Sequence, residues 1–161
     1  MYISYLWTDR MKWIKSYKKK SAKCVFCQIV NKKEKAFILK EGEIFVIMNM
    51  FPYNTGHLII FPKRHVKEIE DLKKDELEKL FTTLQNTVKL LKRALRPKGF
   101  NIGINIGEVA SASIEHIHIH IVPRFGADAG FMEIFDSTKV MPEPLGKTFK
   151  KLKKFSNILK E

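Results

Sequence analysis

The amino-acid sequence predicts an α+β fold, because stretches with the two-residue period of strands are joined by stretches with a helical period. Residues 99–107 and 116–122 alternate apolar residues with polar or small residues, as strands do. Residues 66–95 and 145–161 instead place apolar residues three and four positions apart, which is typical of amphipathic helices. The chain of 161 residues is long enough for a core of its own, and we expect a single domain at residues 1–161.

The chain starts with an aromatic and basic segment, residues 1–22, which we expect to form an arm that packs on the domain. This segment does not resemble a secretory signal, because its charges follow the apolar part and no small-residue cleavage site is present. No apolar run in the chain approaches the roughly 20 residues that are needed to span a membrane. These features predict a soluble, cytoplasmic protein without a membrane partner.

Short elements are expected between the arm and the long helix. In order they are a helix, the two strands of a hairpin, a loop and a third strand, at residues 26–33, 36–39, 44–48, 49–54 and 57–61. Gly42 supplies the flexible position of the hairpin turn, and Pro52 marks the loop. Pro62 lacks a backbone N–H and is expected to end the third strand.

The long helical stretch is charged in the way that a helix dipole favours. Asp75 and Glu76 lie in its first turn, whereas Lys92 and Arg93 lie in its last turn. Pro97 marks its end. We expect this helix to cover the sheet and to carry no catalytic group.

The strand at residues 99–107 has two unlike faces. Its apolar residues point to one side, whereas only asparagine and glycine point to the other. The second face packs poorly in a core but lets a ligand approach the backbone closely. A loop of small residues follows at 109–113, and its N–H groups and the hydroxyls of Ser111 and Ser113 are suited to bind phosphate oxygens.

Three of the five histidines, His116, His118 and His120, alternate with isoleucine. A strand would project all three imidazoles from one face, and Pro123 is expected to end that strand. The three rings could form a solvated strand face, a metal site, or a nucleophilic site in which one imidazole attacks phosphorus. A catalytic zinc site is disfavoured, because the chain has no HxHxD or HExxH pattern.

The only two cysteines form the pair Cys24-Val-Phe-Cys27. Such a pair can be a redox couple, half of a zinc site or two buried thiols. The strand–helix–strand context of a thioredoxin-like couple is not predicted here. A structural zinc ion needs two further ligands, and histidines are the residues available to supply them.

The formal net charge is +13, with lysine clusters at residues 18–20 and 150–154. A strongly basic chain attracts polyanions. Two interpretations are a nucleic-acid partner and a solvated, lysine-rich surface of the kind found in heat-adapted proteins. We favour the second, because neither an aromatic RNA-binding motif nor zinc-knuckle spacing is present. A basic surface would also suit the phosphates of a nucleotide.

The stretch His-Ile-His-Ile-His-Ile-Val at residues 116–122 resembles the histidine triad motif of the HIT superfamily of nucleotide hydrolases and transferases. Residues 49–57 are similar to the Asn-x-x-Pro-x-x-x-Gly-His segment of the same superfamily. Three further segments look like the branch that includes diadenosine tetraphosphate phosphorylases, at residues 6–11, 126–132 and 139–142. The resemblance therefore spans nearly the whole chain.

This resemblance implies a HIT-like fold, in which an antiparallel sheet of about five strands is covered by helices and two sheets join across a homodimer. It implies an enzyme that acts at the α-phosphate of a dinucleoside polyphosphate, such as diadenosine tetraphosphate, through a phosphohistidine intermediate. The alternatives are a HIT-type nucleotide-binding phosphoramidase and a nucleic-acid-associated HIT protein that acts on adenylated ends.

By the same resemblance, His118 is the expected nucleophile, and His120 and His57 are expected to help with orientation and proton transfer. The expected substrate-binding residues are polar: Asn49 for the ribose, Asn105 and Ser113 for the phosphate, and beside them Ser111, His118 and His120. Ala112 stands where many members of the superfamily have glutamine. The sequence therefore does not identify the residue that binds the leaving group or orients a water.

In zinc-carrying members of the superfamily, a Cys-x-x-Cys pair, the histidine of a Pro-x-x-His turn and the first triad histidine hold one ion. The matching residues here are Cys24, Cys27, His65 and His116. The resemblance thus implies a structural Zn²⁺ in a closed site, which holds the N-terminal segment and leaves His118 and His120 for the chemistry.

Overall fold

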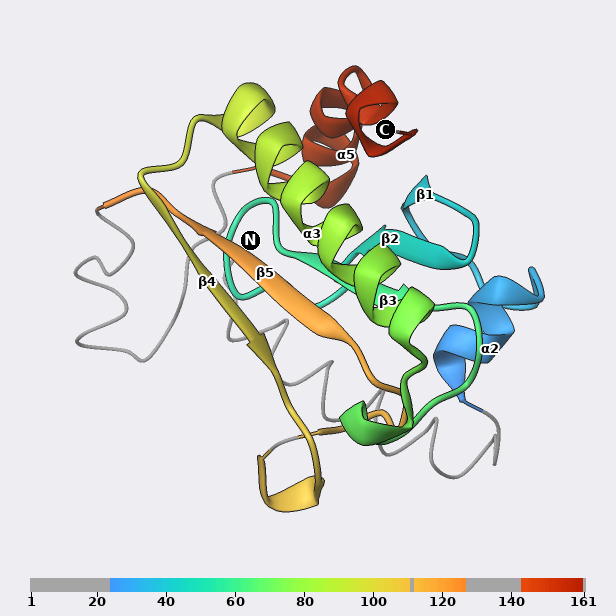
Figure 1. Ribbon diagram of the computed structural model, residues 1–161. Helices are drawn as coiled ribbons and strands as arrows, with labels where there is room; N and C mark the ends of the chain where they lie inside the picture. The colour runs from blue at the N-terminus through green and yellow to red at the C-terminus, as the bar shows by residue number, and fades with distance from the viewer. Residues whose placement is uncertain (1–23, 111, 127–142, 161) are drawn as a thin grey trace.

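The computed structural model describes residues 24–110, 112–126 and 143–160, and its strands form one antiparallel sheet (Figure 1). The five strands are β1 Ile38–Lys40, β2 Ile44–Met48, β3 Leu58–Pro62, β4 Gly99–Ile104 and β5 Ile119–Arg124. Their order across the sheet is β1-β2-β3-β5-β4. The predicted α+β class with an antiparallel five-stranded sheet is confirmed. The predicted arm and the segments 126–132 and 139–142 lie wholly or largely outside the described residues.

Helices lie on both faces of this sheet (Figure 1). The α-helices are α2 Val25–Val30, α3 Lys74–Leu95 and α5 Leu145–Lys153, and the short 3₁₀ helices are η1 Ile69–Asp71, η2 Glu108–Ala110 and η3 Ser156–Lys160. One face is covered by α3, α5 and η3, and the other by α2. Within the described part of the chain, no helix has both the length and the apolar character to cross a bilayer.

The strands β2 and β3 are buried at every position. Val46 and Ile60 pack in the core beneath α3, whereas Ile47 and Phe61 point to the opposite face and pack with Phe26 of α2. Burial of both faces explains why these strands are continuous apolar runs and do not alternate with polar residues. The core therefore has two parts, separated by the sheet.

The long helix α3 begins at Lys74, eight residues later than the helical pattern predicts. Lys73 is extended, and its backbone N–H donates to the Glu76 carboxylate at 2.9 Å, which caps the first turn. The helix ends where Arg96 adopts the left-handed conformation with φ of 51°. The predicted acidic first turn and basic last turn are confirmed.

The strand β5 differs from its prediction at both ends. It begins at Ile119, so His116 and His118 precede it, and the expectation that Pro123 ends it is wrong. The N–H and C=O of one strand residue point to the same neighbouring strand. The Pro123 carbonyl accepts a hydrogen bond from Asn54 Nδ2 at 3.0 Å, beyond the last residue pair of β3 and β5. The missing N–H thus faces a side where no ladder bond is needed.

The strand β4 forms an edge of the sheet and ends at Ile104, three residues before its predicted end. Phe100 and Ile104 of its apolar face pack against the core, but Ile102 is 47% exposed. The C-terminal helix, predicted as one element at 145–161, consists of α5 followed by η3.

Glu76 is expected to contribute stability that disappears in acid. Its carboxylate accepts hydrogen bonds from Arg64 Nε at 2.8 Å and Arg64 Nη2 at 2.6 Å, besides the Lys73 N–H. The Arg64 hydrogen bond lowers the pKa of Glu76 from 4.5 to about 2. Because the pKa is lower in the folded state, the contribution is present above about pH 4.5 and is lost as the pH falls towards 2.

We therefore expect Glu76→Gln to lower the free energy of unfolding by about 1–2 kcal/mol at pH 7, allowing for solvent screening of a surface pair. The difference from the wild type should shrink towards zero near pH 2. Urea unfolding at both pH values measures it, with Glu78→Gln, an exposed residue of the same helix, as the control. Equal losses in the two variants would contradict the assignment.

Candidate active site and metal centre

The predicted alternation of the histidine stretch is present in three dimensions. Ile117, Ile119 and Ile121 lie in the core on the α3 side of the sheet. The intervening histidines lie on the other side, where Phe26 of α2 contacts the rings of His116 and His118 edge to face. The triad therefore faces the short helix that follows the first cysteine.

His118 is held as a neutral imidazole with one defined tautomer. Its Nδ1 donates a hydrogen bond to the His116 carbonyl at 2.7 Å, so the proton is on Nδ1 and the lone pair is on Nε2. The side chain is only 4% exposed, and burial lowers the pKa of His118 below its ordinary value. An unprotonated Nε2 on a neutral ring is the form that can attack an electrophile.

His57 and His120 form a second, connected pair. The backbone N–H of Tyr53 donates to His57 Nδ1 at 3.0 Å, so the neutral His57 ring carries its proton on Nε2. This Nε2 donates to His120 Nδ1 at 2.9 Å. Nδ1 of a neutral His120 is then an acceptor, and its own proton is on Nε2. His57 thereby sets which nitrogen of His120 can donate.

The loop that precedes β3 is folded so that it supports this pair. Asn49 Oδ1 accepts the Phe51 N–H at 3.0 Å, and Asn49 Nδ2 lies 3.3 Å from His57 Nδ1. Gly56 has a φ of 79°, and an added Cβ would lie 2.4 Å from Leu95 Cδ1. Only glycine therefore fits where the loop packs against the end of α3.

His57→Phe should lower kcat about 100-fold, because it keeps a buried ring but removes the donor that orients His120. His57 is completely buried, so it does not touch a substrate in the cavity, and KM should change little. Steady-state kinetics separate the two constants. An unchanged kcat, or a rise in KM that accounts for the whole loss, would contradict a positioning role.

A cavity of about 180 Å³ lies beside the triad. One wall is apolar and is formed by α2, β2 and β3, with side chains of Val25, Phe26, Ile29, Ile47 and Ile59. The polar side chains that line the cavity are those of Glu34, Lys35, Asn49, Ser113, His118 and His120. The apolar wall can take a flat ring, while the polar groups can take hydroxyl and phosphate oxygens.

Not every predicted binding residue lines this cavity. Asn105 lines a neighbouring hollow of about 330 Å³, and the two spaces share Ser113 and Ile114 in their linings. Ser111 lies outside the described residues. The structure thus brings together Asn49, Ser113, His118 and His120 around one cavity and places Asn105 in the adjoining hollow.

Two residues of this region were not predicted from the sequence. The Phe26 ring contacts two triad histidines, and the Tyr53 ring stacks on His57 with centroids 4.9 Å apart. Both lie inside recognised segments, one between the cysteines and one between Asn49 and His57. Their position was therefore a usable signal, although it did not show which way the rings point.

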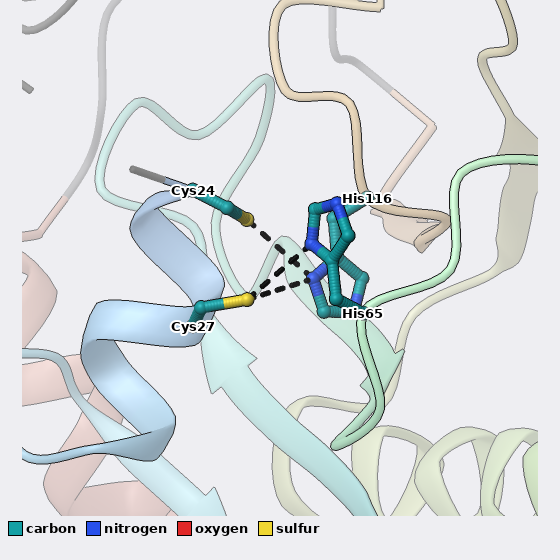
Figure 2. Close-up of side chains that lie close together, drawn as sticks. All are labelled: Cys24, Cys27, His65 and His116. Atoms are coloured by element: carbon teal, nitrogen blue, oxygen red, sulfur yellow. Dashed lines mark hydrogen bonds between the residues drawn. The ribbon is translucent and has the colours of Figure 1, made fainter. Parts of the chain in front are cut away.

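The four predicted metal ligands converge on one point (Figure 2). Cys24 and Cys27 lie at the start of α2, His65 follows β3, and His116 precedes β5. The Sγ of Cys27 is 3.3 Å from His65 Nδ1 and 3.8 Å from His116 Nδ1, and the Sγ of Cys24 is 3.5 Å from His116 Nδ1. All four ligand atoms lie within 4.8 Å of one another. Such separations match tetrahedral coordination of one ion.

The protonation states also fit a metal ion. His116 Nε2 donates to the Pro62 carbonyl at 2.8 Å, which leaves the Nδ1 lone pair facing the thiols. Burial lowers the pKa of His116 to about 4, so its ring is neutral. Burial, and then the neighbouring Cys24, raise the pKa of Cys27 to about 11. Two thiolates in this place therefore need a cation, and this Cys2His2 group could hold one.

Comparisons with known proteins agree with this geometry. The family model described as HIT domain matches residues 30–127. An AP-4-A phosphorylase of Mycobacterium tuberculosis is 40% identical over 117 residues, which cover 71% of this chain. The match spans only 60% of that phosphorylase.

Two further proteins are similar over parts of the chain or in structure. An asymmetrical bis(5'-nucleosyl)-tetraphosphatase of Schizosaccharomyces pombe is 35% identical over 81 residues, 50% of this chain and 44% of the yeast protein. The crystal structure of a zinc-bound histidine triad family protein from Mycobacterium smegmatis superimposes with a TM-score of 0.71 at 27% identity. That likeness covers 85% of this chain and 95% of the other.

Proposed function

This chain belongs to the HIT domain family, and we propose that it is a nucleotide hydrolase or nucleotidyl transferase whose substrate is a dinucleoside polyphosphate. Two relatives support this substrate class by their names, an AP-4-A phosphorylase and a bis(5'-nucleosyl)-tetraphosphatase. Diadenosine tetraphosphate is the substrate that we take as representative. The proposal places cleavage at an α-phosphate.

The observation that carries this proposal is the state of His118. Its Nδ1–H is engaged by the His116 carbonyl, so Nε2 holds the lone pair, and the side chain lines a cavity with Asn49, Ser113 and His120. A neutral, oriented imidazole beside polar groups is suited to nucleophilic attack on phosphorus.

In the proposed reaction, His118 Nε2 attacks the α-phosphorus, and the bond from this phosphorus to the bridging oxygen breaks. That oxygen takes the electron pair and departs within ATP when the substrate is diadenosine tetraphosphate. The Nδ1–H of His118 remains hydrogen-bonded to the His116 carbonyl, and this bond stabilises the positive charge that the ring gains. Water or phosphate then attacks the phosphorus, the P–N bond breaks, and its electron pair returns to Nε2. When water attacks, its proton is released to the solvent.

The neighbouring polar residues have proposed roles that follow from their placement. Asn49 binds the ribose, and Ser113 binds an oxygen of the transferred phosphate, with Asn105 in the adjoining hollow extending that contact. The phosphate role of Ser111, which lies outside the described residues, rests on the sequence alone. His120, with its proton on Nε2, donates to a phosphate oxygen. His57 acts through His120 as a positioning residue.

Two further features belong to the same proposal. The Cys2His2 group holds a structural Zn²⁺, which joins the start of α2 to the segments next to β3 and β5 and takes no part in the chemistry. The protein is a homodimer whose sheets join. The exposed edge strand β4, with Ile102 on its surface, supports this arrangement.

Chromatography of the products from diadenosine tetraphosphate tests the proposed activity. Purified, zinc-supplemented protein is incubated with and without inorganic phosphate. ADP plus ATP in the presence of phosphate shows phosphorolysis, and AMP plus ATP shows hydrolysis. Absence of product under both conditions would overturn the dinucleotide substrate, and adenosine phosphoramidates would then be tested for the phosphoramidase alternative.

A further inference from the structure

Most of the net charge of the chain comes from two stretches, residues 86–98 and 143–160. Their charged residues are eleven cations and a single acid: Lys89, Lys92, Arg93, Arg96, Lys98, Lys147, Lys150, Lys151, Lys153, Lys154, Lys160 and Glu143. The formal net charge of all 161 residues is +13. The basic character is therefore largely concentrated in these two stretches.

The fold brings these two stretches together. α5 and η3 lie beside the C-terminal half of α3 (Figure 1), and Leu90 and Leu91 share a core with Leu152 and Leu159. The Arg93 guanidinium lies over the Phe155 ring, 5.7 Å from its centroid. All eleven cationic side chains are exposed. We call this surface, made by 86–98 and 143–160, the basic face.

The cations of the basic face have few acidic partners. Within the described residues, Lys147 and Lys151 are the members that pair with a carboxylate, that of Glu143. The first half of α3 is different, because Lys79 there pairs with Glu43 and Asp75. A surface that serves only solubility would mix both signs, as the first half of α3 does.

We propose that the basic face binds the phosphate backbone of duplex nucleic acid without regard to sequence. Clustered exposed cations are the electrostatic footprint of phosphate recognition. The described residues of the basic face expose no large apolar side chain that could insert into a bilayer, which disfavours a membrane. Its rings, Phe149 and Phe155, pack against the core, so no exposed ring is available for stacking on the bases of a single strand.

The position of the basic face leaves the nucleotide site open. The basic face lies on the α3 side of the sheet, whereas the cavity beside His118 lies on the α2 side. A bound duplex therefore does not cover that cavity. This inference is independent of the proposed catalytic activity, because it rests on charge and placement alone.

Fluorescence anisotropy with a short labelled DNA duplex of mixed sequence tests the inference. The altered protein carries Lys92→Glu, Lys150→Glu and Lys154→Glu, three cations of the basic face. The control carries Lys33→Glu, Lys63→Glu and Lys74→Glu, which change the net charge equally at exposed lysines elsewhere. Both are compared with the wild type at about 50 to 200 mM salt, where phosphate contacts give steep salt dependence.

We expect the first variant to bind at least about tenfold more weakly, with the slope of log K against log salt reduced by about 2 to 3. The control should stay close to the wild type. No binding by the wild type at low salt, or equal losses in the two variants, would overturn the proposal. Tighter binding to phosphatidylserine vesicles than to the duplex would also overturn it, in favour of a membrane surface.

Discussion

His118→Ala is expected to lower turnover of diadenosine tetraphosphate at least about 10³-fold, because it removes the atom that forms the proposed covalent intermediate. The neighbouring groups that are proposed to contact the nucleotide remain, so its dissociation constant should change by less than about threefold. Single-turnover kinetics and equilibrium binding measure the two effects. Trapping with radiolabelled substrate should give a labelled wild-type protein and no labelled variant.

The control for this variant must separate chemistry from folding, because His118 is almost fully buried. His118→Gln keeps more of the side-chain volume and still lacks an imidazole, and it should be as inactive as the alanine variant. Circular dichroism establishes that both variants are folded. Residual turnover within about tenfold of the wild type in a folded variant would exclude His118 as the nucleophile.

Removal of the proposed zinc ion is expected to lower the free energy of unfolding by a large share. If free zinc exceeds its dissociation constant about 1000-fold, bound metal contributes about 4 kcal/mol to the free energy of unfolding. For a chain of this size, such a loss lowers the unfolding temperature by about 8–16 °C. Elemental analysis should find one zinc per chain, and calorimetry before and after chelation measures the shift.

A matched pair of variants in one turn tests the same site. His65→Ala removes a proposed ligand and should lose the metal, whereas Lys63→Ala alters an exposed neighbour and should retain it. Chelator should then shift the unfolding temperature of the second variant only. Protein that contains no zinc, or unfolds at one temperature with and without chelator, would instead favour free thiols or a redox pair.

The sequence predicts the strands and helices well where one physical cause dominates. Alternation in residues 116–122 correctly separates the histidine face from the isoleucine face, since register follows directly from a two-residue period. The expectation that Pro123 ends β5 is wrong, because the cost of a missing backbone N–H depends on which neighbouring strand that position faces. The identity of that neighbour is a tertiary property. The apolar pattern predicts too early a start for α3, because the Glu76 cap decides where this helix begins.

The candidate site also has parts that the sequence predicts and parts that depend on tertiary structure. The family resemblance names four metal ligands, and their ligand atoms do converge in the structure. It does not reveal that Asn105 lines a separate hollow, since β4 ends before that residue and the chain then turns. Contacts between rings, such as that of Tyr53 with His57, depend on side-chain rotamers that no linear pattern encodes.

His116 serves two neighbours at once. Its ring offers Nδ1 to the thiol pair, and its carbonyl holds the proton of the proposed nucleophile. A displacement of that ring is expected to shift the backbone carbonyl that fixes the tautomer of His118, the next histidine in the chain. A metal ion in the proposed Cys2His2 site would therefore be coupled to the proposed nucleophile, and we expect its removal to lower catalysis although no catalytic atom is lost.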